Sequence, residues 1–241
     1  MKDSKGNRRQ VSKEEFFYVI DDNYDEHAEL AIPNYTALHE DLARMVGRIW
    51  QRDHPLRLLD LGAGTGKTTE IILTRFPNAK AVAVDKFPEM LSHAEVRLGR
   101  FTDRVEYLIG DFMDIDFGLD FDLCVSSLAI HHQDPTGKQE LFEKVFNALR
   151  PGGVFSMIDW IKFNDPEMQQ FSFEVAEEHV RKSLNSNPEI MSEWVEHWRY
   201  LNIPDSLEDQ LSWLKNCGFQ YADCISRFYG IALLYGRKLI D

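Results

Sequence analysis

Residues 56–66 read LRLLDLGAGTG, and this stretch carries more structural information than any other part of the chain. A leucine-rich run ends in Gly62, Gly64 and Gly66, and a segment with a helical pattern follows at once. A short apolar run is typical of a buried parallel strand, and glycines after it leave bare backbone that a ligand can approach closely. The following helix would direct its free N–H groups at that ligand. The stretch therefore predicts a nucleotide-type binding turn and favours an enzyme.

The spacing of the glycines distinguishes this turn from other nucleotide-binding turns. The dinucleotide fingerprint is G-x-G-x-x-G, whereas here G-x-G-x-G follows an acid two positions earlier. A P-loop ending at Lys67-Thr68 would need a glycine where the chain has Leu61. The pattern instead resembles motif I of the class I S-adenosylmethionine (SAM) methyltransferases, matched here by Asp60, Gly62, Gly64 and Gly66. The alternative is an ordinary tight turn between a strand and a helix.

Further landmarks follow in the order expected of a Rossmann-like sheet. Residues 80–85, KAVAVD, predict a second strand ending in Asp85, 19 residues after the last glycine, where such folds place an acid on the ribose hydroxyls. A carboxylate suits two neighbouring hydroxyls because it accepts hydrogen bonds and donates none. The remaining landmarks are the strand VEYLIGD at 105–111, the segment FDLCVSSLAIHH at 121–132, and the turn RPGG at 150–153 before the strand VFSMIDW.

Together these landmarks resemble the class I SAM methyltransferases, and the resemblance implies a fold. We expect a Rossmann-like, doubly wound α/β fold with a seven-stranded, mostly parallel sheet and an antiparallel last strand. N-terminal helices and a helical cap would complete it. The expected organisation is a tail and helical lid over residues 1–50 and a methyltransferase domain over 51–241, with the cap inserted at about 165–204. Ser206 and Asp209 predict the capped start of the last helix, and Gly218 its end.

The resemblance also implies how the cofactor SAM is held. In the family, the acid after the third strand contacts the adenine amino group and the next residue packs on the ring. The Pro33-Asn34-Tyr35 segment is similar to the carboxy-SAM synthases, relatives that use SAM and prephenate in wobble-uridine tRNA modification, in which the tyrosine contacts the cofactor. Tyr24 either covers SAM or only packs. The expected cofactor-binding residues are Tyr24, Tyr35, Asp60, Gly62, Ala63, Gly64, Asp85, Lys86, Met90, Asp111, Phe112 and Ser126.

One departure separates this chain from those relatives. Carboxy-SAM synthases carry an arginine in the cap that pairs with the additional carboxylate of their cofactor. Aligned from Glu189-Ile190, the matching position here is Trp194, and Arg199 could replace the arginine only if the helix register shifts. A neutral indole cannot grip a carboxylate as a guanidinium does. We therefore expect plain SAM.

The acceptor side of the site is less sharply defined. His131 and His132 follow the fourth strand, and ligands bind beyond the carboxyl ends of parallel strands. These histidines are the candidate catalytic residues because imidazole can take a proton from an acceptor. Alternatively they shape the loop, since methyl transfer can rely on alignment alone. The expected substrate-pocket residues are Asp159, Trp160, Trp194, Trp198 and Tyr200. The tryptophans at 194 and 198 share a helical face and form either cap packing or an aromatic wall.

Composition restricts the class of protein. With 27 Lys and Arg against 40 Asp and Glu, the net charge of -13 argues against an extended nucleic-acid surface. No run approaches the roughly 18 apolar residues of a membrane span, and the first ten residues lead into no apolar signal core. Three cysteines without metal-ligand spacing favour a reducing cytoplasm, and no metal site is expected.

The sequence therefore predicts a cytoplasmic SAM-dependent methyltransferase that acts on a small-molecule acceptor, with no membrane partner and with a homodimer left open. One alternative is a carboxy-SAM synthase-like enzyme of tRNA wobble-uridine modification. Another is a non-catalytic SAM-binding partner subunit with a blocked acceptor cavity, and a dehydrogenase is a more distant alternative. The residues name neither the acceptor nor the atom that receives the methyl group.

Overall fold

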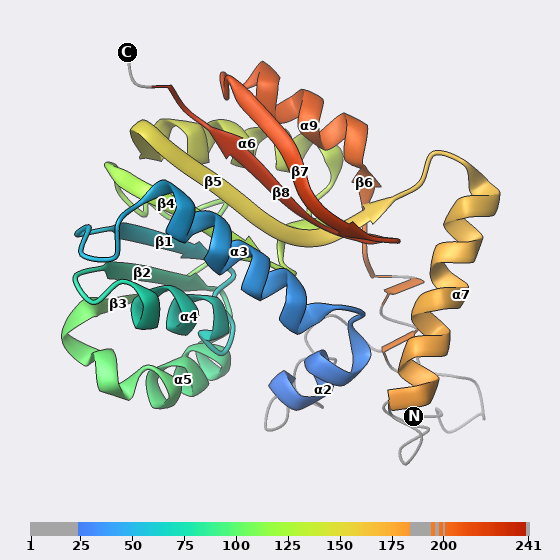
Figure 1. Ribbon diagram of the computed structural model, residues 1–241, viewed down its shortest axis with the longest axis horizontal. Helices are drawn as coiled ribbons and strands as arrows, with labels where there is room; N and C mark the ends of the chain where they lie inside the picture. The colour runs from blue at the N-terminus through green and yellow to red at the C-terminus, as the bar shows by residue number, and fades with distance from the viewer. Residues whose placement is uncertain (1–23, 184–193, 196–197, 200, 240–241) are drawn as a thin grey trace.

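The computed structural model describes residues 24–183, 194–195, 198–199 and 201–239, and its centre is one twisted sheet (Figure 1). The strands are β1 (Arg57–Leu61), β2 (Lys80–Asp85), β3 (Val105–Ile109), β4 (Phe121–Ser127), β5 (Leu149–Lys162), β6 (Asp205–Ser206), β7 (Tyr221–Phe228) and β8 (Ile231–Arg237). Their order is β3-β2-β1-β4-β5-β8-β7, with the short β6 beside β5. Strands β1 to β5 pair in parallel, and β8 runs antiparallel to β5 and β7. The expected mostly parallel sheet with an antiparallel last strand is confirmed.

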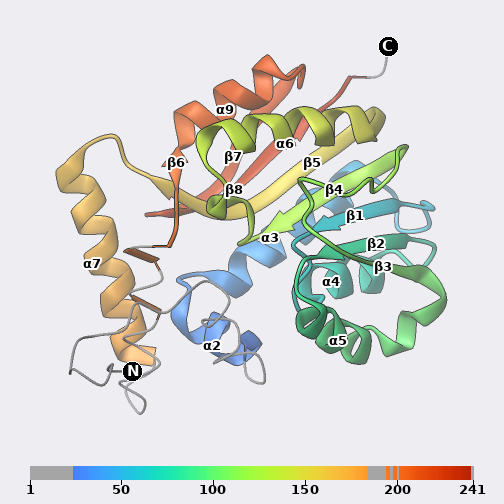
Figure 2. The ribbon, with the colours of Figure 1, turned by 180° about the vertical axis from the view of Figure 1, so that it is seen from behind.

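Helices cover both faces of this sheet. They are α2 (Tyr24–Ala31), α3 (Tyr35–Ile49), α4 (Lys67–Arg75), α5 (Pro88–Arg97), α6 (Pro135–Ala148), α7 (Pro166–Ser183) and α9 (Leu207–Asn216), with the short 3-10 helices η2 (Gly99–Arg104) and η3 (Ile130–His132). Helices α3 and α4 lie on one face, and Figure 2 shows α6 and α9 along the other. The doubly wound arrangement expected from the sequence is confirmed.

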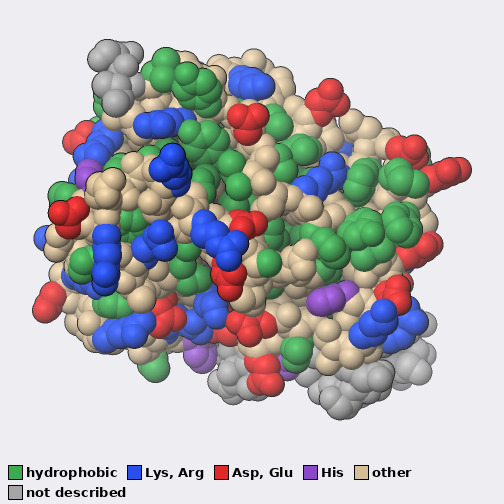
Figure 3. Space-filling view, in the orientation of Figure 1, with side chains coloured by type: hydrophobic (Ala, Val, Ile, Leu, Met, Phe, Trp, Pro, Cys, Tyr) green, Lys and Arg blue, Asp and Glu red, His purple; other side chains and the backbone are tan. Residues whose placement is uncertain are grey.

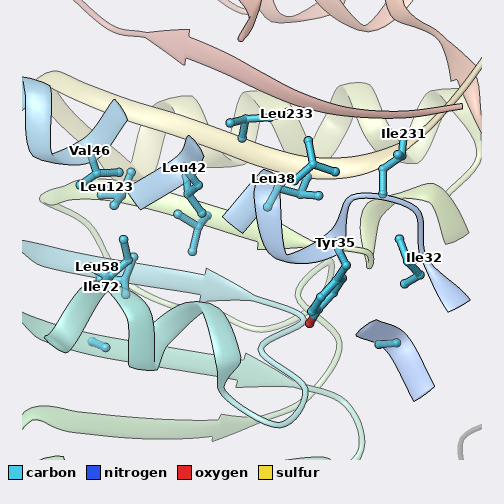
Figure 4. Close-up of a cluster of buried hydrophobic side chains, with 14 of the residues drawn as sticks. Ile32, Tyr35, Leu38, Leu42, Val46, Leu58, Ile72, Leu123, Ile231 and Leu233 are labelled. Atoms are coloured by element: carbon cyan, nitrogen blue, oxygen red, sulfur yellow. The ribbon is translucent and has the colours of Figure 1, made fainter. Parts of the chain in front are cut away.

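Helix α3 contributes an apolar stripe to the core. Leu38, Leu42 and Val46 recur every four residues and therefore lie on one side of the helix. Figure 4 shows this side facing side chains of β1, β4, β8 and α4. The three side chains are at most 2% exposed, so each contributes about 1.5–3 kcal/mol through burial of apolar surface.

Strand β1 is buried on both of its faces. Leu58 packs with α3 and α4, whereas Leu59 and Leu61 pack with residues of α6 on the opposite side. Successive side chains of a strand point to opposite faces, so covering both faces requires apolar residues at consecutive positions. This explains why the run before the glycines is continuous rather than alternating.

Two helices, α7 and α9, follow β5 in the part of the chain where a cap and a last helix are expected. Helix α7 lies within the 165–204 segment that the sequence predicts as a cap, and it packs against α2 (Figure 1). Helix α9 begins as predicted, since the Ser206 hydroxyl oxygen accepts the Asp209 N–H at 3.0 Å. Gly218 follows with a left-handed φ of 112°. Residues 1–23 of the expected tail and lid, and residues 184–193, 196–197 and 200 of the expected cap, lie outside the described residues.

The described surface carries charges of both signs. On the face shown in Figure 3, Lys and Arg side chains are interspersed with Asp and Glu. Over the described ranges, none of the helices combines the length and apolar character that crossing a membrane requires.

Candidate functional site

A cleft of about 670 Å³ opens where the parallel strands end. Its lining comes from α2 and from the segments that follow β1, β2, β3 and β4. The lining residues are Tyr24, Gly62, Gly64, Asp85, Lys86, Phe87, Met90, Asp111, Phe112, Ser127, Leu128, Ala129, His132 and Gln133. Eight of the twelve expected cofactor-binding residues are among them. The structure therefore brings most of the predicted set to one place, at the edge of the sheet where such folds bind ligands.

The three glycines of the loop after β1 all have left-handed φ values, of 68°, 55° and 80°. A Cβ on Gly62 would lie 2.3 Å from the Ala129 Cβ, and one on Gly66 would lie 2.9 Å from Leu98 of the segment after α5. A Cβ on Gly64 would meet only the Met90 methyl group, at 3.5 Å. The first and third glycines are thus required by protein packing, whereas the middle one faces the open cleft.

Asp85, at the end of β2, is held rigidly by the backbone. Its Oδ2 accepts the Gly64 N–H at 2.8 Å and its Oδ1 accepts the Phe87 N–H at 2.9 Å. Burial raises the pKa of the Asp85 carboxyl, and these N–H groups oppose the shift. A carboxylate offers about four lone-pair positions, so these N–H groups leave acceptor capacity for a donor in the cleft. This arrangement fits a pair of neighbouring hydroxyls.

Asp111 and Phe112 follow β3 on the far side of Asp85. The Asp111 Oδ1 accepts the Met113 N–H at 2.9 Å, which fixes the carboxylate in a local turn. Phe112 is 8% exposed and packs with the core around β1 and β2 while still lining the cleft. An acid beside an aromatic ring suits a flat, hydrogen-bonding base such as adenine.

Four expected cofactor residues lie beside the cleft without lining it. Asp60 accepts the Thr69 hydroxyl at 2.6 Å, and Ala63 donates its N–H to the Val84 carbonyl. Figure 4 shows Tyr35 reaching from the start of α3 toward the carboxyl end of β1, and the ring is buried within the core. Ser126 donates its hydroxyl to the Leu61 carbonyl at 2.8 Å.

The next residue, Ser127, lines the cleft instead, and sequence reasoning missed it. It is followed by Leu128, whose φ of 58° is uncommon for a branched residue and turns the chain sharply away from β4. Phe87, Leu128, Ala129 and Gln133 were also missed. Their position directly after β2 or β4 is the signal that could have found them, because loops after parallel strands form the ligand edge.

Asp60→Asn is expected to change how stability depends on pH. Burial raises the pKa of Asp60 from 3.8 to about 7, opposed by hydrogen bonds from Thr69. Between these two pKa values the folded chain holds a proton on Asp60 that the unfolded chain releases. The stability that this proton contributes is complete below 3.8, the pKa of the unfolded chain, and it is lost as the pH rises to about 7, the pKa of the folded chain. Relative to the variant, the wild type should lose up to about 1.4 kcal/mol per pH unit in this window. Urea unfolding of both ligand-free proteins measures it, and a pH-independent difference would contradict it.

The two histidines after β4 have different environments. His131 is 3% exposed, donates its backbone N–H to Asp159 Oδ2 at 3.0 Å, and pairs through its ring Nδ1 with the other oxygen of Asp159. The ring of His132 lies 4.1 Å from that of His131, centroid to centroid, and lines the cleft. His131 and Asp159 therefore form a buried pair, and His132 is the histidine that faces the cleft.

The tryptophans of the expected substrate pocket form a packed series. Trp160 lies 5.1 Å from Trp198, Trp198 lies 6.2 Å from Trp194, and Trp194 lies 6.4 Å from Tyr24, measured between ring centroids. Trp194 and Trp198 are each 4% exposed. Among the described residues these rings pack against one another, and Tyr24 joins the series to the residues that line the cleft. Tyr200 lies outside the described residues.

Among the described residues that line the cleft, one is a lysine, Lys86, and none is an arginine. Arg199 donates through Nε to Glu177 of α7 at 2.8 Å, and its guanidinium lies over the Phe173 ring. In the described parts of the chain, no group of three His, Cys, Asp or Glu residues could hold a metal ion.

Comparisons with known proteins agree with this geometry. Residues 58–153 match a family described as a methyltransferase domain. A carboxy-S-adenosyl-L-methionine synthase from Aeromonas salmonicida is 25% identical over 224 residues, covering 91% of this chain and 89% of that protein.

Two solved structures share the fold. An O-methyltransferase family 2 protein from Planctomyces limnophilus, in complex with apigenin, has a TM-score of 0.59 and 20% identity over 90% of this chain. Human N-acetylserotonin methyltransferase, in complex with SAM, has a TM-score of 0.56 and 18% identity over 95% of this chain. The chain spans 62% and 60% of their lengths, less than two thirds in each case. The glycine loop after β1 and the acid that ends β2 both lie within residues 58–153, so the part of the chain that matches the methyltransferase domain contains the cofactor side of the cleft, and SAM is the cofactor that this match supports.

Proposed function

We propose that this protein transfers the methyl group of SAM to a small-molecule acceptor. The observation that supports this most strongly is the pairing of Asp85 with Gly64, which fixes a carboxylate with spare acceptor capacity beside a glycine that leaves the cleft open. When bound, SAM supplies an activated methyl group on its sulfonium sulfur. In this proposal Asp85 holds the ribose hydroxyls, Asp111 and Phe112 hold the adenine, and Tyr24 covers the cofactor from α2.

The residues at the end of β4 and β5 suit the acceptor side. His132 lines the cleft and would take the proton that an acceptor hydroxyl or amine loses as the new bond to carbon forms. His131 would act as a positioning residue, because its backbone and ring are both held by Asp159. Much of the acceleration would come from aligning acceptor and methyl group in a cleft from which α2 and the cap exclude water.

The proposal extends to organisation and location. Residues 1–50 would form a lid and residues at about 165–204 a cap, around a methyltransferase domain that spans 51–241. Cys124, Cys217 and Cys224 are free thiols, which fits a reducing compartment such as the cytoplasm. A homodimer is compatible with this arrangement.

The test is a transfer assay with a labelled methyl group. The purified protein is incubated with SAM and pools of small hydroxyl, amine and thiol compounds, and mass spectrometry detects methylated product together with S-adenosylhomocysteine. Binding of SAM without transfer to any acceptor would favour the non-catalytic partner subunit. Binding of NAD in preference to SAM would contradict the proposal and favour a dehydrogenase.

Asp85→Ala is expected to weaken binding of SAM and S-adenosylhomocysteine by about 10- to 150-fold, because hydrogen bonds to a charged acceptor are worth roughly 1.5–3 kcal/mol. Isothermal titration calorimetry measures the change. Glu89→Ala is the matched control, since Glu89 is an exposed carboxylate of α5 that does not line the cleft. An unchanged affinity in Asp85→Ala would exclude the assigned position of the ribose.

A second candidate is an activity like that of the carboxy-SAM synthases, favoured by the relative that aligns over 91% of the chain. The described residues favour plain SAM, because Trp194 is packed within the cap and Arg199 is paired with Glu177. A carboxylate without a partner is costly to bury. Titration of the wild type with SAM and carboxy-SAM side by side separates the two, and tighter binding of carboxy-SAM would make the second candidate the better one, with Lys86 as a cation already at the cleft.

A further inference from the structure

A buried histidine on α3 contacts the cleft through one serine. His39 is 2% exposed, its Nδ1 lies 2.9 Å from the Tyr35 carbonyl oxygen, and its Nε2 lies 3.2 Å from the Ser127 hydroxyl oxygen. Ser127 ends β4 and lines the cleft, whereas His39 does not. The two residues are 88 positions apart in sequence, so only the fold brings them together.

The two contacts determine which way the hydrogen bonds run. A carbonyl oxygen can only accept, so the hydrogen of the His39 ring is on Nδ1. Burial lowers the pKa of His39 to about 4, opposed by this hydrogen bond, so the ring is neutral near pH 7 and its Nε2 carries a lone pair. The Ser127 hydroxyl therefore donates to His39. Turning that hydroxyl toward the cleft would leave the buried His39 Nε2 without a hydrogen-bond donor, which is unfavourable.

The hydroxyl oxygen of Ser127 consequently presents only lone pairs to the cleft. This oxygen can accept a hydrogen bond from a ligand group that carries an N–H or O–H, but it cannot donate one to a ligand. Among the parts of SAM, the α-ammonium group is donor-only, whereas the α-carboxylate only accepts.

The strand order places that ammonium group near Ser127. Asp111 follows β3, Asp85 ends β2, and Ser127 ends β4, on the far side of β1. Neighbouring strands are about 4.8 Å apart, so a ligand with its adenine at β3 and its ribose at β2 extends its amino-acid part past the glycine loop to β4.

We propose that His39 is a positioning residue that takes the Ser127 proton, so that Ser127 accepts a hydrogen bond from the ammonium group of the cofactor's amino-acid part. This inference rests on the proposed function, because it assumes that SAM lies across the strand ends in this direction.

The test compares two ligands that share the adenosine part. S-adenosylhomocysteine carries the amino-acid part, and 5′-methylthioadenosine lacks it. Ser127→Ala should lower the affinity for S-adenosylhomocysteine by about tenfold or more. The same variant should change the affinity for methylthioadenosine by less than about twofold, and calorimetry measures both affinities. His39→Leu, which keeps a similar side-chain volume, should lower the affinity for S-adenosylhomocysteine by about threefold or more. His39→Gln should restore most of the loss, because its amide oxygen can accept from Ser127.

A double-mutant cycle separates this role from a structural one. If His39 acts through Ser127, adding His39→Leu to Ser127→Ala should cause no further loss of S-adenosylhomocysteine affinity. Additive losses, or equal losses for both ligands, would overturn the inference. Nitrogen-15 NMR of the ligand-free wild type gives a readout without cofactor, with a neutral ring protonated at Nδ1 expected for His39 near pH 7, and the other tautomer overturning it. If the wild type binds neither ligand, the proposed function fails, and the inference fails with it.

Discussion

Gly64→Val is expected to abolish measurable binding of S-adenosylhomocysteine. A Cβ at this position meets only the Met90 methyl group at 3.5 Å, so the branched side chain has room in the protein and projects into the cleft. The left-handed φ of 55° adds backbone strain, because β-branched residues rarely adopt it. We expect a loss of at least about a hundredfold, or about 2.7 kcal/mol, in affinity.

Two control variants separate occlusion from unfolding. Gly64→Ala shares the backbone strain but adds only one carbon, and it should bind better than the valine variant. Gly99→Val lies where an added Cβ meets nothing within 4 Å, so its affinity should equal that of the wild type. Calorimetry measures the affinity of each variant for S-adenosylhomocysteine, and thermal unfolding measures its stability. A folded Gly64→Val protein with wild-type affinity would show that the cofactor lies elsewhere.

Asp205→Ala is expected to destabilise the fold by about 3–5 kcal/mol. Lys138 of α6 is 1% exposed, and its Nζ lies 2.6 Å from Asp205 Oδ2 and contacts the Ile203 carbonyl. Removing the carboxylate leaves a buried ammonium group with one neutral partner. The free energy of unfolding in urea measures the loss, which corresponds to a lowering of Tm by about 10 °C for a chain of this size.

A surface pair provides the comparison. Glu178 and Lys182 of α7 also form an ion pair, but their side chains are 54% and 74% exposed, so solvent screens the pair and Glu178→Ala should change the free energy of unfolding far less than Asp205→Ala does. Combining Asp205→Leu with Lys138→Met should recover most of the stability, since no buried charge is then left unpaired, and Lys162, the other cation beside Asp205, is 42% exposed. Equal small losses in Asp205→Ala and Glu178→Ala would mean that the buried pair is open to solvent.

Local signals were enough to predict much of the fold and nine of the fourteen residues that line the cleft, eight as cofactor-binding residues and His132 as a catalytic candidate. The glycine loop, Asp85 at the end of β2 and the Ser206 cap of α9 each depend on residues within a few positions of one another. The prediction of Ser126 rather than Ser127 as a cleft residue shows the limit of such local signals. Adjacent strand residues point to opposite faces, and the face that borders the cleft depends on the turn at Leu128, which the sequence alone does not show.

Contacts between distant segments could not be predicted. Whether Trp194 and Trp198 pack or form a wall depends on Trp160 and Tyr24, which come from two other elements. Lys138 and Asp205 are 67 positions apart, and no pattern in either segment indicates the other. Such pairs follow from the sheet order, because it decides which helices and loops become neighbours.

The pairing of β5 with β6 has an evolutionary consequence. Ile161 and Lys162 lie beside Asp205 and Ser206, so the chain leaves the sheet and returns to it at the same point. The two ends of the intervening segment therefore lie side by side in the sheet. The entropic cost of closing such a loop rises only slowly with its length. Descendants of this sequence can therefore lengthen, shorten or exchange the segment without altering the register of the other strands. Under the proposed function, in which this segment caps the acceptor side, a chimaera joined at 162 and 205 would exchange the cap while the cofactor half of the sheet stays unchanged.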